Sequence, residues 1–413
     1  MPLANSSKAN KILFLNTFAF TICFFVWLIN SVLITFLSGK FVWSQWSSIE
    51  IGYLMATPIL TGSIFRLPVG VLTDKYGGKP VMVALLLLCA IPTYLLSFAS
   101  GFWSFVFCGI GFGLVGTSFA VGIAYTSIWF PKEKQGFALG LFGMGNIGAA
   151  LTAMIAPKVL TYFTDGGLNI EGWVVLPKVY AVVLVVVAII FFFFAENKKP
   201  EGNSKSLSGM FKPLKKARVW RFGLYYFLVF GGFVAFVNWL QPIYKNVFGL
   251  DKETAGMYVA TFVIASSMVR ALGGYISDKI GARKVMYYVL TLSLLISGGL
   301  MIWTPINVII YVAIIIVLGC IWGTGMAAVY KYIPDYFPNE VGVVGGMVGV
   351  LGGLGGFVSP IVFGYIKDGT GLWSSCWILI AVLSAVSLVW MHISVQKMNK
   401  ISLSKLAFGQ VAK

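Results

Sequence analysis

The sequence predicts an all-α polytopic membrane protein with twelve transmembrane helices. Of its 413 residues, 59% are hydrophobic and only 10% are charged, and the mean hydropathy is +0.90. A soluble domain does not have this composition, because its surface needs far more charge. The apolar residues also form twelve runs close to the length of about 20 residues that one bilayer crossing requires. Segments in lipid must satisfy their backbone polar groups internally, so these runs are expected to be helices.

The twelve runs are separated by polar loops. In chain order they cover residues 12–37, 51–73, 81–99, 102–129, 136–160, 174–195, 222–246, 254–277, 285–303, 306–330, 341–366 and 374–395. The first run is too long for a signal peptide and has no small-residue cleavage site after it. We therefore expect it to be a membrane helix like the others.

A single long polar stretch, Glu196–Arg221, separates six runs from six. It predicts an N-terminal six-helix half over 1–195, a cytoplasmic basic linker over 196–221, and a C-terminal six-helix half with a short tail over 222–413. The second part of the linker mixes apolar and basic residues, which suits a segment lying on an anionic lipid surface. A solvated tether explains the same composition, and both interpretations stay open.

The charge balance is strongly basic, with 30 Lys and Arg against 13 Asp and Glu and a net charge of +17. In a soluble protein this balance suggests nucleic acid, but the cytoplasmic loops of membrane proteins are also enriched in basic residues. Twenty-two of the basic residues fall on the predicted side of the termini, and six fall in the opposite loops. This asymmetry predicts a multi-pass protein of the inner (plasma) membrane with cytoplasmic termini, and excludes nucleic acid as a partner.

The two halves repeat one another. Residues Arg66–Lys79 match Arg270–Arg283, 204 positions later, with Arg, Gly, Asp, Lys and Gly coinciding. A second match, 207 positions apart, pairs Phe130-Pro131 with Phe337-Pro338. Such a duplication places a pseudo-twofold axis through the molecule, where a shared site can be exposed to each side in turn.

The first repeat contains the loop motif Gly70-x-x-x-Asp74-Lys75-Tyr-Gly-Gly-Lys79. This motif resembles the signature between helices 2 and 3 of the major facilitator superfamily, which recurs between helices 8 and 9. The resemblance implies the major facilitator fold with two pseudo-symmetric six-helix halves. Asp74 and its counterpart Asp278 stand near helix ends, where a carboxylate can pair with a cation or cap a neighbouring helix. We expect both to act in gating or helix packing.

Charges in the hydrophobic depth of the membrane are costly and usually functional. All 13 carboxylates lie in loops or at helix ends. Arg66 and Arg270 each precede an Asp by eight residues, about 12 Å along a helix, so both are expected near the midplane without an acidic partner. The flat fork of arginine suits a planar oxyanion such as nitrate, nitrite or a small carboxylate. The alternative is that each arginine snorkels or bonds to backbone carbonyls.

Two of the predicted helices are unusually rich in glycine, at residues 136–148 and 345–357. Small residues at this density let helix backbones approach closely. Together with the paired arginines, these helices resemble the two nitrate signatures of the nitrate/nitrite porter family, and the resemblance covers nearly the whole chain.

The resemblance to the porter family implies a set of site residues. The substrate-binding residues are an anion clamp of Arg66 and Arg270, a hydrogen-bond donor at Asn146, aromatic walls at Phe119, Tyr226 and Phe230, and Gly143. The gating or helix-packing glycines are Gly140, Gly145, Gly148, Gly349, Gly352 and Gly353. Spacing alone indicates only that Tyr226 and Phe230 share a helix face.

Lys331 and Asp335 stand four residues apart at the inner end of the predicted tenth helix. This spacing predicts an exposed helical ion pair. The alternative hypothesis places Lys331 in a cytoplasmic gate or a proton pathway. Without a carboxylate in mid-membrane, any coupled proton would not use the usual buried Asp or Glu.

These observations predict transport of nitrate and/or nitrite by alternating access, through proton symport or nitrate/nitrite exchange, by a monomer in contact with membrane lipid. The alternative is a carrier for a small organic anion such as formate, oxalate or lactate, which an arginine pair also serves. The short tails disfavour a sensor. No enzymatic constellation is visible, and the five single cysteines and one histidine predict no disulfide framework, metal site or cofactor.

Overall fold

The computed structural model describes residues 6–38, 46, 48–199, 212–250, 252–302 and 307–411. Within these ranges every regular element is a helix. Twelve helical segments of the described chain are long and apolar enough to cross a membrane. The predicted all-helical architecture with twelve spans is therefore confirmed. Residues 200–211 of the predicted linker lie outside the described residues.

The first six spans are interrupted by short breaks. Their α-helices are α1 (Ser6–Trp27), α2 (Ile29–Ser38), α3 (Ser48–Ile64), α4 (Arg66–Tyr76), α5 (Gly78–Leu95), α6 (Phe102–Gly113), α7 (Ser118–Ser127), α8 (Lys132–Gly143), α9 (Gly148–Phe163) and α10 (Val175–Phe194). Two breaks are 3₁₀ turns, η2 (Leu114–Thr117) and η3 (Met144–Ile147). Both contain glycine, which weakens the α-helix and lets the backbone tighten locally.

The last six spans are more continuous. Their α-helices are α12 (Ala217–Tyr226), α13 (Gly232–Phe248), α14 (Lys252–Ile280), α15 (Ala282–Ile302), α16 (Val308–Tyr336), α17 (Val341–Thr370) and α18 (Cys376–Val411). A π-helical turn, η7 (Phe227–Gly231), separates α12 from α13. Such turns are rare and occur frequently at functional sites.

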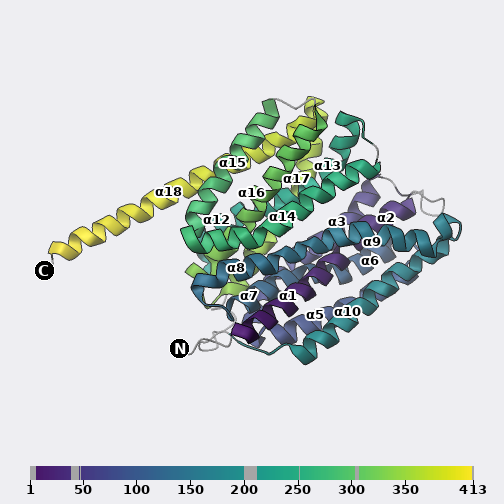
Figure 1. Cartoon of the computed structure of the whole chain (residues 1–413), viewed down its shortest axis with the longest axis horizontal. Coiled ribbons are helices and arrows are strands. Elements are labelled where there is room, and N and C mark those ends of the chain that lie inside the picture. Colours follow the sequence, from purple (N-terminus) through teal and green to yellow (C-terminus); the bar gives the residue numbers. More distant parts are fainter. Residues whose placement is uncertain are drawn as a thin grey trace.

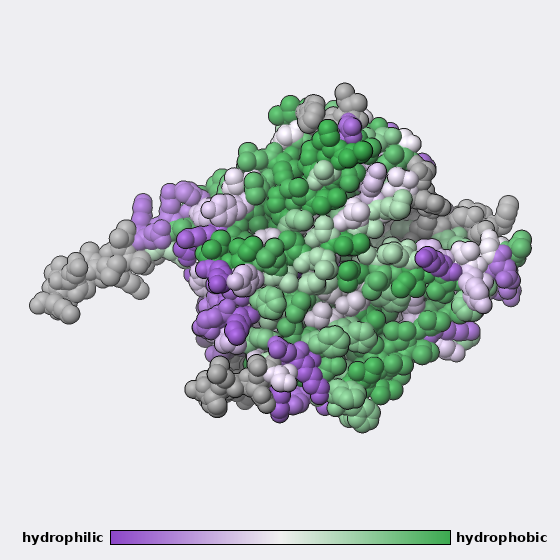
Figure 2. All heavy atoms as spheres, in the orientation of Figure 1, coloured by the Kyte–Doolittle hydropathy of each residue, from purple (hydrophilic) through white to green (hydrophobic). Residues whose placement is uncertain are grey.

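The helices of the two predicted halves lie in two parts of the molecule. In Figure 1, α1 to α10 lie together and α12 to α18 lie together, with α18 extending beyond the other helices. The two groups meet where α4 packs on α17 and where α8 packs on α14. Figure 2 shows hydrophobic residues across the middle of the visible surface and hydrophilic residues at two opposite ends. This pattern fits a belt that faces lipid.

One end of the bundle carries two repeat-related turns at Gly77 and Gly281, whose φ angles are +90° and +88°. Glycine adopts this conformation without a steric penalty. The segment after α10 lies at the same end, because Asn197 donates a hydrogen bond to the carbonyl of Tyr76. We call this the basic end of the molecule.

At the basic end, glycines bring helices of the two groups into backbone contact. Gly70 of α4 faces the backbone of Gly342 in α17, and Gly274 of α14 faces the backbone of Gly136 in α8. A Cβ atom at any of the four positions would overlap a neighbouring backbone or side-chain atom. The basic end is therefore closed by two direct helix contacts.

The tenth apolar run covers only part of its helix. The run 306–330 ends before Lys331, whereas α16 continues to Tyr336 and contains Pro334. Neighbouring helices in a membrane bundle can satisfy the backbone groups that such a proline leaves free. Lys331 and Asp335 therefore lie on the last turns of α16, where Lys331 is buried and Asp335 is exposed.

The backbone contact of α8 with α14 makes Gly274→Val a test of the packing. The added side chain would meet the backbone of Gly136, and overpacking of this kind costs about 1–3 kcal/mol. We expect a lower midpoint of thermal unfolding in detergent. Gly298→Val is the matched control, because a Cβ at Gly298 meets no atom within 4 Å; equal destabilisation by both would contradict this account.

Candidate substrate-binding site

The two predicted arginines are buried at the centre of the bundle. Arg66 of α4 is 0% exposed and Arg270 of α14 is 1% exposed. Among the described residues, neither forms an ion pair with a carboxylate. Two large cations in a low-dielectric interior are costly without compensating partners.

The arginines are only partly satisfied by the protein. Arg66 donates from Nε to the carbonyl of Gly116 at 3.1 Å and from Nη1 to the carbonyl of Gly349 at 2.8 Å. Arg270 approaches the Met326 sulfur with Nη1 at 3.5 Å. Nη2 of Arg66 and Nε of Arg270 have no hydrogen-bond partner. Backbone carbonyls therefore accept from part of the Arg66 guanidinium. Both guanidiniums keep an N–H group without a hydrogen-bond partner.

Three aromatic rings surround the arginines. Phe119, Tyr226 and Phe230 are nearly parallel, with Tyr226 stacked on Phe230 at 4.9 Å and Phe119 at 6.0 and 6.3 Å from the other two ring centroids. The Arg66 guanidinium lies 5.4 Å from the Phe119 ring and 5.3 Å from the Phe230 ring. Arg270 lies 5.6 Å from the Phe119 ring. Both cations therefore contact the face of one ring, an arrangement that stabilises buried charge.

The spacing of the rings limits how a flat anion could enter. An ion in van der Waals contact with two parallel rings needs about 7 Å between them, since each contact takes about 3.5 Å. The observed separations of 6.0 and 6.3 Å are shorter. Phe119 must therefore move away from Tyr226 and Phe230 by about 1 Å before an anion fits between the rings.

Tyr330 of α16 is a site residue that the sequence did not indicate. Its ring stands edge-on to Phe119 and to Tyr226, with centroid distances of 4.8 Å for both pairs. Its hydroxyl donates to the carbonyl of Gly345 at 3.1 Å. The repeat pairs position 330 with Ile123, which is not aromatic. The internal repeat therefore did not mark Tyr330 as a candidate site residue.

Asn146 lies in the turn η3 and is 1% exposed. Neither its amide nitrogen nor its amide oxygen has a partner. An unpartnered buried amide costs free energy unless a ligand or water completes it. Its position supports the predicted role as a hydrogen-bond donor, which stays a prediction.

The predicted glycines occupy positions of close approach. A Cβ at Gly143 would meet the Arg270 guanidinium, and one at Gly140 would meet the backbone of Arg270. The remaining contacts are Gly349 against the Arg66 side chain, Gly352 against the Tyr226 ring, Gly353 against the Ser63 hydroxyl, Gly145 against Phe20, and Gly148 against the backbone of Thr21. Gly145 and Gly148 thus pack η3 and α9 against α1, Gly353 packs α17 against α3, and the other four lie against the arginines or Tyr226.

The two repeat-related aspartates each accept hydrogen bonds from backbone N–H groups near the N-terminal end of a helix of the other group. Asp74 accepts hydrogen bonds from the backbone N–H groups of Gly342 and Val343 at 2.9 and 3.0 Å. Asp278 accepts from Gly136 at 2.9 Å and Phe137 at 2.8 Å. A carboxylate at a helix N-terminus also interacts favourably with the helix dipole. The contacts agree with the expected packing role.

The predicted ion pair between Lys331 and Asp335 is present, but the expected exposure of Lys331 was wrong, because this lysine is buried. Its Nζ lies 3.6 Å from Asp335, but its shorter ion pair is with Asp278 at 3.0 Å. The side chains of Lys331 and Asp278 are only 8% and 6% exposed. Lys331 also donates to the carbonyl of Lys132 at the start of α8. The contact between α8, α14 and α16 buries Lys331, which helical spacing alone placed on the surface.

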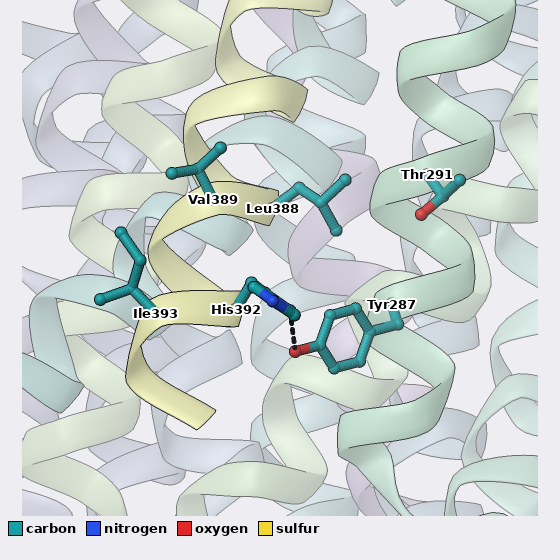
Figure 3. Close-up of a pocket in the computed structure, with 6 residues that line it drawn as sticks. All are labelled: Tyr287, Thr291, Leu388, Val389, His392 and Ile393. Carbon is teal, nitrogen blue, oxygen red and sulfur yellow. Dashed lines mark hydrogen bonds between the residues drawn. The ribbon is translucent and has the colours of Figure 1, made fainter. Parts of the chain in front are cut away.

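A shallow groove on the outside of the bundle does not fit an anion. It lies between α15 and α18 and is lined by Tyr287, Thr291, Leu388, Val389, His392 and Ile393. The Tyr287 hydroxyl lies 3.4 Å from Nδ1 of His392. Figure 3 shows this contact beside the apolar side chains of the groove. No Lys or Arg lines it, so the arginine pair remains the candidate site.

The twelve spans and the buried cationic site define a polytopic membrane transporter. Residues 15–360 match the family model described as Major Facilitator Superfamily. The chain belongs to this superfamily, which confirms the resemblance of its loop motif. The fucose:proton symporter FucP of E. coli has a similar fold, with a TM-score of 0.72 at 15% identity over 92% of this chain and 99% of that chain.

Two proteins that are similar in sequence have names that state a function. A probable nitrate/nitrite antiporter, NarK1, of Thermus thermophilus is 40% identical over 410 residues, covering 94% of this chain and 92% of the relative. A nitrite extrusion protein of Bacillus subtilis is 28% identical over 373 residues, covering 89% and 91%. Relatives of this kind are transporters, and the prediction that the chain is not an enzyme is confirmed.

The Asp74 cap makes a measurable contribution to the closed basic end. In Asp74→Ala the first turn of α17 loses an acceptor for two N–H groups, which costs about 1 kcal/mol. We expect a lower thermal unfolding midpoint than for Glu133→Ala, which removes an exposed carboxylate of α8. A midpoint for Asp74→Ala equal to that of the control would show that the cap contributes nothing.

Proposed function

We propose that this protein transports nitrate and/or nitrite by alternating access, with the anion bound between Arg66 and Arg270. One observation carries the proposal: two buried guanidiniums on repeat-related helices keep N–H groups without a partner. An anion that bridges them supplies the missing acceptors and neutralises charge on both helix groups. The functions named for the two relatives, nitrate/nitrite antiport and nitrite extrusion, support the choice of anion.

The chemistry of the surroundings favours a small planar anion. Arginine binds a flat oxyanion through parallel hydrogen bonds in its own plane. The faces of Phe119, Tyr226 and Phe230 are nearly parallel, so they suit a flat ion better than a tetrahedral one. The amide of Asn146 adds a donor that no protein group uses.

The positions of the two arginines in the fold support alternating access. Arg66 and Arg270 belong to the two pairs of helices, α4 with α17 and α8 with α14, that close the basic end. An anion held by both arginines favours a closed arrangement, because it offsets the repulsion of two like charges. Binding drives the cycle only if the anion binds the occluded state more tightly than the open states.

The proposal includes a location and an organisation. We place the protein as a monomer in the plasma membrane with both termini cytoplasmic, so that the basic end faces the cytoplasm. The organisation is two six-helix halves, 1–195 and 222–413, joined by the basic linker 196–221. The excess of basic residues on one side supports this orientation.

The arginine pair gives the first test. Lysine keeps the charge but loses the planar fork, so Arg66→Lys or Arg270→Lys is expected to lower nitrate uptake in proteoliposomes by at least about tenfold, the cost of one charged hydrogen bond. Arg283→Lys, the same change at the start of α15, is expected to transport normally. Normal uptake by either of the first two variants would overturn the proposed site.

The transported ion and the coupling are tested together in proteoliposomes. We expect labelled nitrate uptake to be inhibited by unlabelled nitrate or nitrite and to be insensitive to formate, oxalate and lactate. Uptake that requires internal nitrite and ignores an imposed pH gradient indicates exchange. Uptake that requires the gradient indicates proton symport. Equal inhibition by the carboxylates would favour an organic-anion carrier.

A further inference from the structure

We propose that Lys331 is a positioning residue of the gate at the basic end, where it holds the Asp278 carboxylate against backbone N–H groups near the N-terminal end of α8. We call this contact the Lys331 latch: the side chains of Lys331 and Asp278 together with the start of α8. The latch must open before an anion can leave at this end. The inference rests on the proposed alternating-access transport.

The latch joins the two groups of helices through several polar contacts. Asp278 of α14 accepts from the N–H groups of Gly136 and Phe137 in α8 at 2.9 and 2.8 Å. Lys331 of α16 lies 3.0 Å from the same carboxylate and donates to the carbonyl of Lys132. Two side chains from the second group thus bind one helix start in the first group, and separating α8 from α14 breaks the contacts to α8.

Burial explains why the carboxylate needs the lysine. Asp278 is 6% exposed in its side chain and Lys331 is 8% exposed. A carboxylate removed from water is strongly destabilised unless it is both paired and hydrogen-bonded. When α8 and α14 separate, water reaches the carboxylate and the pairing matters less. Lys331 therefore stabilises the closed basic end more than the open one.

The lysine occurs at only one of the two repeat-related contacts. Asp74 caps α17 as Asp278 caps α8. The position that corresponds to Lys331 by the repeat of 207 residues is Ala124, which is 4% exposed. The ion pair with Lys331 is thus a feature of the contact between α8 and α14 that the duplication does not explain.

The latch is also adjacent to the substrate site. Tyr330 precedes Lys331 on α16, and its ring contacts Phe119 and Tyr226 at 4.8 Å. An anion must displace Phe119 relative to Tyr226 to fit between them. Because Tyr330 touches both rings, this displacement acts on the turn of α16 that carries Lys331. Anion binding is expected to change how often the latch opens.

Cysteine accessibility measures the opening directly. A Cβ at Gly345 of α17 would have its nearest neighbours, Ile123 and Tyr330, at 3.6 Å, so Gly345→Cys fits without displacing them. In a background without the five native cysteines, this thiol is labelled by a membrane-impermeant maleimide added at the basic end of vesicle-embedded protein. Labelling requires separation of α8 from α14 or of α4 from α17.

Loss of the latch is expected to raise the labelling rate. Lys331→Gln and Asp278→Asn should each increase labelling at position 345 by roughly tenfold, the population change for losing one charged hydrogen bond. Lys134→Gln is the matched control, because it removes an exposed lysine of α8. Labelling rates of both latch variants equal to that of the control would overturn the proposal.

Two further variants separate the latch from a simple structural ion pair. Lys331→Arg keeps the cation and is expected to label slowly, as the parent does. The exchange Asp278→Lys with Lys331→Asp restores the pair but places a cation at the N-terminus of α8, where it is unfavourable, so fast labelling is expected. Slow labelling of the exchange variant would show that the pair alone suffices, against the proposed latch.

Nitrate supplies the last readout. In the parent protein, nitrate is expected to change the labelling rate, and in Lys331→Gln this response should be lost. Labelling without nitrate does not depend on transport, so slow labelling of the latch variants overturns the latch alone. Absence of nitrate uptake by the parent, with fast labelling of the latch variants, overturns the proposed substrate and leaves the gate in place.

Discussion

Two buried guanidinium charges constrain the rest of this structure. Arg66 and Arg270 sit at the centre of the bundle, and neither is paired with a carboxylate among the described residues. The protein offers them carbonyls, a thioether and aromatic faces instead. These partners make the charges tolerable without using every N–H group, which is the condition that the proposed anion site requires.

Glycine residues let neighbouring helices pack closely against each of the two arginines. Glycine at 140 and 143 lets α8 lie against Arg270, and glycine at 346 and 349 lets α17 lie against Arg66. Without side chains between them, the helices that carry the arginines also form the contacts that close the basic end. In the proposed mechanism the same helices position the anion and move when the gate opens, which would link binding to gating.

Local sequence explains some parts of the site well and others poorly. The depth of Arg66 and Arg270 followed from counting residues to the nearest helix end, and the caps by Asp74 and Asp278 followed from their place at such ends. Lys331 was predicted to be exposed but is buried, because its burial depends on how α8 lies across α14 and α16. Tyr330 was missed for the same reason, since an aromatic residue in an aromatic-rich chain has no local mark of function.

The sequence by itself determined the twelve helices, the repeat, and the two repeat-related arginines, because hydropathy, internal similarity and charge are local properties of the chain. Only the tertiary structure decided which rings face the guanidiniums, where the helices break into 3₁₀ and π turns, and that Asp278 pairs with Lys331. Those outcomes depend on the rotation and crossing of helices distant in sequence, which are set by packing between them.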